Sequence, residues 1–140
     1  MKAGLVFSLM AAALLHAGPT CASPAADMHL IYWTVGDCGP CLLWSRSERK
    51  QELLAEAKRL GITFVEVSRP RLADPVARYA WPAAQQTLAE QMQAYPAAQF
   101  TPAFDFVCKG QLQRRLAGLA DWDSFWRKTL RTLARECPVG

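Results

Sequence analysis

Apolar and polar positions follow one another along this chain in blocks that predict alternating strands and helices. Two short apolar and β-branched runs, 29–35 and 62–67, are typical of buried strands. Between them, from Cys38 onward, apolar residues recur at helical spacing among charged ones, and Gly61 ends this predicted helix. The first strand therefore passes into a helix at Cys38.

A second helical region is expected after the second strand. Asp74 and Pro75 indicate the cap and first residue of a helical turn. Large apolar residues three, four or seven positions apart then predict a fuller helix over about 82–94. Such a stripe is typical of core packing rather than of a cofactor site.

The last third of the chain predicts a hairpin and a closing helix. A strand over 103–108 pairs with a strand over 111–116, in which Leu112 and Leu116 occupy alternate positions. Asp121 caps a final helix whose apolar face continues for about four turns. The order βαβαββα predicts a single α/β domain with a central mixed sheet flanked by helices.

The N-terminal segment has the pattern of a secretory signal peptide. Lys2 precedes an apolar run that is shorter than the ~20 residues of a membrane span. Small residues follow the run, so we expect a signal over 1–22, with cleavage after Ala22 or Ala25. The mature domain over 27–138 would then be periplasmic or otherwise exported.

The cysteine count agrees with export. Cleavage at either position removes Cys21 and leaves four of the five cysteines, an even number that suits an oxidising compartment. A lipid anchor on Cys21 is the alternative, but the preceding Gly18-Pro19-Thr20 lacks the residues of a bacterial lipobox.

Length and charge narrow the class of partners. The 140 residues suffice for one core, and none is spare for a dimerisation domain, so we expect a monomer. The formal net charge is +4, and the basic residues of 46–59 are interleaved with glutamates. We therefore expect no nucleic-acid partner.

The motif Cys38-Gly39-Pro40-Cys41 carries the chemistry, because it lies where a strand meets a helix. Backbone N–H groups at a helix start stabilise a thiolate and lower the cysteine pKa below its free value of ~8.5. Cys38 is therefore the expected nucleophile, and Cys41, nearly one turn later, the resolving thiol. Pro40 suits a first helical turn, and Gly39 leaves room for a substrate backbone.

Two other interpretations of such a pair are half a zinc site and a structural disulfide. Zinc needs further ligands, and neither Cys108 nor Cys137 supplies a second pair at a recognisable spacing; His29 is the only histidine after the signal. We therefore expect no metal. A structural link across so small a loop would constrain the unfolded chain little.

With its strand order and Thr101-Pro102 before a strand, the Cys38–Cys41 motif resembles the thioredoxin superfamily over about residues 29–137. The resemblance implies that Thr101–Pro102 is a cis peptide bond beside the active disulfide. The backbone of Thr101 would then pair with the substrate. Without the cysteine motif, an ordinary trans proline opening an edge strand is the alternative.

Two residues depart from the thioredoxin pattern. Asp37 replaces the tryptophan before the first cysteine, and Tyr32 replaces a buried carboxylate that relays a proton from the resolving thiol. Asp105 is a candidate substitute for that proton relay. The interpretation we favour is that Asp105 is a satisfied or partly exposed carboxylate.

Of the remaining cysteines, Cys108 ends a predicted strand, and Cys137 lies on the apolar face of the last predicted helix. In an exported domain they favour a structural disulfide over two buried free thiols. A second redox pair is a further alternative that the spacing does not support.

These observations predict a thiol–disulfide oxidoreductase that acts on exported proteins and takes part in redox homeostasis. The Gly-Pro between the cysteines resembles the reducing thioredoxins, and the Thr before the proline resembles periplasmic isomerases. This resemblance implies reductase or isomerase-like use, with a membrane redox partner keeping the pair reduced. No cofactor is expected besides the Cys38–Cys41 disulfide. The alternatives are a dithiol oxidase, a metallochaperone, and a non-catalytic binding or chaperone module in envelope complex assembly.

Overall fold

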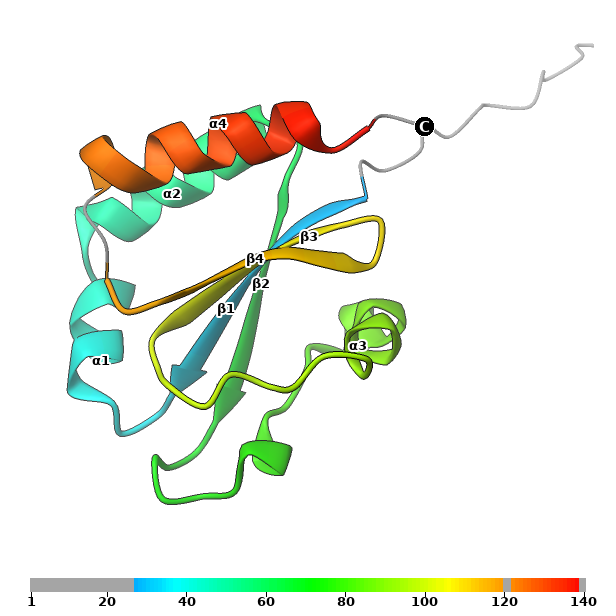
Figure 1. Cartoon of the computed structure of the whole chain (residues 1–140). Helices are drawn as coiled ribbons and strands as arrows, with labels where there is room; N and C mark the ends of the chain where they lie inside the picture. Colours follow the sequence, from blue (N-terminus) through cyan, green and yellow to red (C-terminus); the bar gives the residue numbers. More distant parts are fainter. Residues whose placement is uncertain (1–26, 120–121, 139–140) are drawn as a thin grey trace, which may run out of the picture.

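A four-stranded mixed sheet forms the centre of the computed structural model, which describes residues 27–119 and 122–138 (Figure 1). In the sheet order β2-β1-β3-β4, β1 pairs parallel with β2 and antiparallel with β3, and β4 pairs antiparallel with β3. The strands are β1 (Met28–Val35), β2 (Thr63–Arg69), β3 (Ala103–Cys108) and β4 (Gln111–Ala117). The predicted α/β fold class is confirmed.

Helices cover both faces of this sheet. α2 (Glu48–Arg59) and α4 (Arg127–Glu136) lie side by side over one face, while α3 (Gln86–Met92) covers the other (Figure 1). The short α1 (Gly39–Ser45) follows β1 at one end of the sheet. Short 3₁₀ segments lie at Val76–Arg78 and Ala83–Gln85, and a π-helical turn, Trp122–Trp126, precedes α4.

The core has two parts, one on each face of the sheet. Successive residues of a strand point to opposite faces, so Tyr32 belongs to the cluster beneath α2 and α4, and Trp33 to the cluster beneath α3. Phe104 and Leu130 join Tyr32 in the first cluster. Burial of β1 on both sides explains its nearly continuous apolar sequence.

The helix predicted from Cys38 to Gly61 is two helices. It breaks after Ser45, where the Ser47 hydroxyl donates to the Trp44 carbonyl at 2.7 Å and accepts from the Lys50 N–H at 3.4 Å. Ser47 has an extended backbone and is the N-cap of α2. The apolar spacing continues through the break, so periodicity alone did not reveal it.

The other helix boundaries also differ from the predictions. The segment expected to be helical over 82–94 contains a 3₁₀ turn, and α3 begins only after Gln85, whose backbone is not helical. The turn predicted from Pro75 begins one residue later. Asp121 and the predicted signal peptide with its two cleavage positions lie outside the described residues. Within residues 27–119 and 122–138, no helix is long and apolar enough to cross a membrane.

A β-bulge changes the faces of the hairpin. Lys109 and Gly110, both with positive φ, connect β3 to β4. The register shifts by one residue between Phe106 and Val107. Leu112 therefore packs beneath α3 and Leu116 beneath α2 and α4, whereas simple alternation predicts one face for both.

Candidate active site

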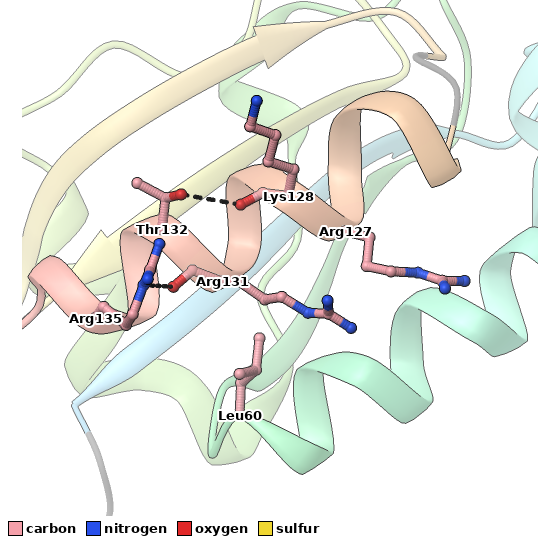
Figure 2. A pocket seen from close by; sticks show the side chains of 6 residues that line it. All are labelled: Leu60, Arg127, Lys128, Arg131, Thr132 and Arg135. Atoms are coloured by element: carbon pink, nitrogen blue, oxygen red, sulfur yellow. Dashed lines mark hydrogen bonds between the residues drawn. The ribbon is translucent and has the colours of Figure 1, made fainter.

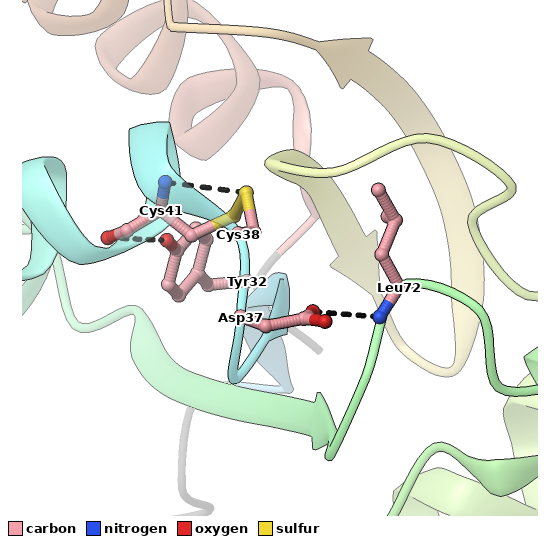
Figure 3. Close-up of a disulfide and its surroundings, with 5 residues drawn as sticks. All are labelled: Tyr32, Asp37, Cys38, Cys41 and Leu72. Atoms are coloured by element: carbon pink, nitrogen blue, oxygen red, sulfur yellow. Dashed lines mark hydrogen bonds between the residues drawn. A yellow bond between two sulfur atoms is a disulfide. The ribbon is translucent and has the colours of Figure 1, made fainter.

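Cys38 and Cys41 form a disulfide at the start of α1, with their Cα atoms 5.2 Å apart (Figure 3). Cys38 is the N-cap residue, and its sulfur accepts a hydrogen bond from the backbone N–H of Cys41 at 3.3 Å. Pro40 occupies the first turn, where a missing N–H costs no helical bond. The sulfur of Cys38 thus has the backbone donor that the sequence predicts for a stabilised thiolate.

The two sulfur-bearing residues differ in accessibility. Cys38 is 7% exposed and Cys41 only 1% exposed, so a second protein reaches Cys38 more readily. At Gly39, which follows Cys38, an added Cβ would meet nothing within 4 Å. The space above Gly39 is therefore open, as a bound substrate backbone requires.

The loop after β2 is held beside this disulfide by contacts that the sequence did not predict. The carboxylate of Asp37 accepts a hydrogen bond from the backbone N–H of Leu72 at 2.7 Å (Figure 3). The backbone N–H of Gly36 donates to the Arg69 carbonyl at 3.0 Å. A Cβ on Gly36 would lie 2.6 Å from the carbonyl oxygen of Pro70, so glycine permits this close approach.

Thr101–Pro102 is a cis peptide bond, as the family resemblance implies. Trp33 of β1 pairs with Ala103 of β3, so the cis bond lies just beyond the end of this ladder. It is therefore at the sheet end where β1 leads into Cys38. The Pro102 carbonyl accepts a hydrogen bond from the Gly118 N–H at 2.8 Å, which connects this segment to the end of β4.

Tyr32 lies beneath the second cysteine. Its hydroxyl donates a long hydrogen bond, 3.5 Å, to the carbonyl oxygen of Cys41 (Figure 3). Its ring packs against Trp44 and Phe104. Burial raises the pKa of the Tyr32 hydroxyl above its usual value. Tyr32, at the position where many thioredoxins have a buried carboxylate, is therefore a neutral phenol.

Asp105 is fully buried in an ion pair. One carboxylate oxygen accepts from Arg115 Nε at 2.7 Å, and the other accepts from Arg115 Nη2 at 2.6 Å and Trp33 Nε1 at 2.8 Å. The hydrogen bond to Asp105 raises the pKa of Arg115. Asp105 also lies on the sheet face opposite Tyr32. These contacts support the interpretation that Asp105 is a carboxylate whose hydrogen bonds are satisfied. None of them connects Asp105 to Cys41, so they give no support to a proton relay from Cys41 to Asp105.

Cys108 and Cys137 form the second disulfide, with Cα atoms 5.8 Å apart. Cys108 pairs with Met28 at the beginning of β1, so this disulfide lies at the sheet end opposite Cys38. It joins the end of β3 to the residue that follows α4. Within residues 27–119 and 122–138, no group of three or more His, Cys, Asp or Glu side chains is placed to hold a metal ion.

Exposed apolar side chains occur in three segments at the sheet end that carries the first disulfide. Leu42 and Leu43 directly follow Cys41, Leu72 is the residue bonded to Asp37, and Phe100 precedes the cis bond. Leu43 and Phe100 are each 76% exposed. We call these four residues, Leu42, Leu43, Leu72 and Phe100, the apolar rim. Sequence reasoning missed the rim, because its members come from three separate segments.

Comparisons with known proteins give only distant likenesses. No family model and no curated protein matches the sequence. Among solved structures, the periplasmic thioredoxin SoxS from Paracoccus pantotrophus is 20% identical over 80% of this chain and 100% of its own, with a TM-score of 0.47. A thioredoxin-family thiol:disulfide interchange protein from Chlorobium tepidum is 10% identical over 81% of each chain, with a TM-score of 0.48.

Thioredoxin from Trypanosoma brucei brucei is 13% identical over 79% of each chain, with a TM-score of 0.46. Likenesses this distant carry no conclusion about this chain. The sheet order, the disulfide at the start of α1 and the cis bond before β3 are the features in which this α/β domain resembles the thioredoxin-like fold. Within that class it carries the motif Cys-Gly-Pro-Cys, followed directly by exposed leucines.

Proposed function

We propose that this protein is a thiol–disulfide oxidoreductase that acts on exported proteins through Cys38 and Cys41, as a reductase or an isomerase. The observation that carries the proposal is the place of Cys38: its sulfur caps α1 and accepts a hydrogen bond from a backbone N–H, and Cys38 is the more exposed residue of the pair. Cys38 is therefore the nucleophile and Cys41 the resolving thiol.

The reaction begins from the reduced pair. The Cys38 thiolate attacks one sulfur of a substrate disulfide and forms a mixed disulfide, while the other substrate sulfur leaves as a thiolate and takes up a proton. Cys41, after losing its proton, attacks the sulfur of Cys38. The Cys38–Cys41 disulfide forms, and the second substrate sulfur leaves as a thiolate that takes up a proton. Two electrons have then passed from the pair to the substrate, and the two protons come from Cys41 and from solvent.

Isomerisation uses the same mixed disulfide. A different thiolate of the substrate attacks the substrate sulfur that is bonded to Cys38, which forms a new substrate disulfide and releases Cys38 as a thiolate. No net electron transfer occurs in this branch. In the reductase branch, a membrane redox partner returns two electrons to the Cys38–Cys41 disulfide.

The apolar rim supports a polypeptide as the substrate. Large exposed apolar side chains are unusual on a soluble surface and mark binding sites where they gather. Here they lie at the same sheet end as the sulfur that attacks, and the open space at Gly39 supports the binding of an extended substrate segment there. We propose that the backbone of Thr101 pairs with this segment. We further propose that the domain acts as a monomer in the periplasm, after removal of the signal peptide over 1–22.

Insulin reduction by dithiothreitol tests the proposal. The wild-type protein should accelerate precipitation of the insulin B chain, and Cys38→Ser should reduce the rate to that of dithiothreitol alone. Cys41→Ser should accumulate a mixed disulfide with insulin that mass spectrometry detects. Equal rates for the wild type and Cys38→Ser would contradict catalysis and favour a non-catalytic binding module.

The direction of exchange is tested by equilibration of the Cys38/Cys41 pair with glutathione. A reductase should have a potential near the ~−270 mV of thioredoxin. A value near the ~−120 mV of strong bacterial dithiol oxidases would replace the reductase and isomerase with an oxidase.

A further inference from the structure

A groove lies between α2 and α4 (Figure 2), and its lining includes neither Cys38 nor Cys41. Its volume is about 420 Å³. Leu60, at the end of α2, lines one side, and α4 contributes the rest of the lining. The α4 residues that line it are Arg127, Lys128, Arg131, Thr132 and Arg135.

Helical geometry gathers the cations of α4 along this groove. Residues four apart lie on the same side of a helix, so Arg127, Arg131 and Arg135 form a row over two turns, with Lys128 beside it. The side chains of Lys128, Arg131 and Arg135 are exposed. Four positive charges from one helix therefore border a single concave surface.

One carboxylate on α2 faces this row, and it is already engaged by two guanidinium groups. Glu56 Oε1 lies 2.7 Å from Nε of Arg131 and 2.7 Å from Nη2 of Arg59, and its Oε2 accepts from Arg59 Nε at 2.8 Å. Hydrogen bonds from Arg59 and then Arg131 lower the pKa of Glu56 to about 2. Because Glu56 is shared between two arginines, it leaves the groove with an excess of positive charge.

The excess of positive charge in the groove comes mainly from Lys128 and Arg135. Neither forms an ion pair with a carboxylate among the described side chains, and Arg135 Nε instead donates to the Arg131 carbonyl at 3.3 Å. Glu136, which follows Arg135, lines the neighbouring grooves rather than this one. The charge of both cations is thus available to a ligand.

We propose that the groove between α2 and α4 binds a phosphate group. Guanidinium groups offer paired N–H donors that match the oxygens of a phosphate, and an ammonium adds a compact charge. Leu60 offers an apolar contact to the part of the ligand that bears the phosphate. A free phosphorylated molecule and the headgroup of an anionic lipid share this chemistry. The proposed phosphate site does not depend on thiol–disulfide exchange at Cys38 and Cys41.

Calorimetric titration of the oxidised protein with inorganic pyrophosphate, at low ionic strength, tests the free ligand. Co-sedimentation with phosphatidylglycerol vesicles, compared with phosphatidylcholine vesicles, tests the lipid. The test variant is Lys128→Gln/Arg135→Gln, which removes two charges but keeps a polar side chain and the helix propensity. Arg78→Gln removes an exposed charge from the 3₁₀ turn after β2 and is the control.

The wild type and Arg78→Gln should bind one of the two probes, and the double variant should bind it about tenfold more weakly. Binding should weaken as salt rises. Pyrophosphate binding identifies a free ligand, and binding only to phosphatidylglycerol vesicles identifies a lipid headgroup. Failure to bind either probe, or an equal affinity of the double variant and Arg78→Gln, would overturn the proposal. Circular dichroism checks that every variant is folded.

Discussion

At the scale of single residues, the ion pair of Asp105 with Arg115 shows how a buried charge is accommodated in this sheet. The two residues face each other across β3 and β4, and Trp33 supplies a further donor to the carboxylate. Arg115 also donates to the Pro96 carbonyl at 2.7 Å, which connects β4 to the chain that leads toward β3. The pair thus joins three segments on the face covered by α3.

Asp105→Asn should lower the free energy of unfolding by about 2–3 kcal/mol, because it leaves the half-buried Arg115 guanidinium without its counter-charge. Urea unfolding at neutral pH measures this loss. The pH profile for alkylation of Cys41 in the reduced protein should stay unchanged. A shifted profile would instead show that Asp105 acts on the resolving thiol.

Residues that act through their immediate sequence neighbours could be predicted, and those that act through distant contacts could not. Cys38, Pro40 and Cys41 follow from the chemistry of a strand that meets a helix. The bond from Leu72 to Asp37 spans 35 residues, and no local pattern indicates it. The role of Asp105 was open for the same reason, since Arg115 becomes its partner only through the hairpin register.

At the scale of elements, α2 and α4 are joined by Glu56. This carboxylate pairs with Arg59 in its own helix and with Arg131 in α4. Its pKa in the folded protein, about 2, lies below the ordinary value of 4.5. The ionised form is therefore the one that stabilises the packing of the two helices.

Glu56→Gln should reduce the free energy of unfolding by about 1 kcal/mol at pH 7, as is usual for ion pairs near a surface. A lowered folded-state pKa contributes its full stabilisation above the unfolded pKa and loses it as pH falls to the folded pKa, so this difference from wild type should shrink as pH falls from about 4.5 toward 2. Urea unfolding of both proteins at pH 7, 4.5 and 3 measures it. Glu52→Gln, at an exposed position of the same helix, is the control. A difference that does not change with pH would contradict the ionic origin.

The kind and order of the elements could be predicted, but two of their details could not. Hydrophobic periodicity located the four strands and the main helices. Ser47 interrupts a helix without interrupting that periodicity, because its hydroxyl replaces backbone hydrogen bonds. The bulge beside Phe106 depends on how β3 and β4 pair, so the sequence of β4 alone does not reveal it.

At the scale of the whole molecule, the two disulfides lie at opposite ends of the sheet and close loops of different size. Cys108 and Cys137 are 29 positions apart, and Cys38 and Cys41 only three. Loop-closure entropy makes the first link worth about 3–4 kcal/mol and the second about half as much. The long-range link is therefore the one suited to stability.

Cys108→Ala/Cys137→Ala should lower the free energy of unfolding by about 3–4 kcal/mol, because the unfolded chain regains the entropy of that loop. Urea unfolding under oxidising conditions gives the value. Insulin reduction by the folded variant should remain within about twofold of wild type, since the opposite sheet end carries that chemistry. A loss of activity as large as that of Cys38→Ser, in a folded variant, would instead assign this pair a redox role.

The open sheet has a consequence for self-association. β2 and β4 are its outer strands, and unpaired backbone groups on such edges are templates for aggregation. Ala80 forms a bridge to Ser68 near the end of β2, and β4 exposes Gln113 and the charged Arg114 at its bulge. These features make edge-to-edge growth into larger sheets unfavourable.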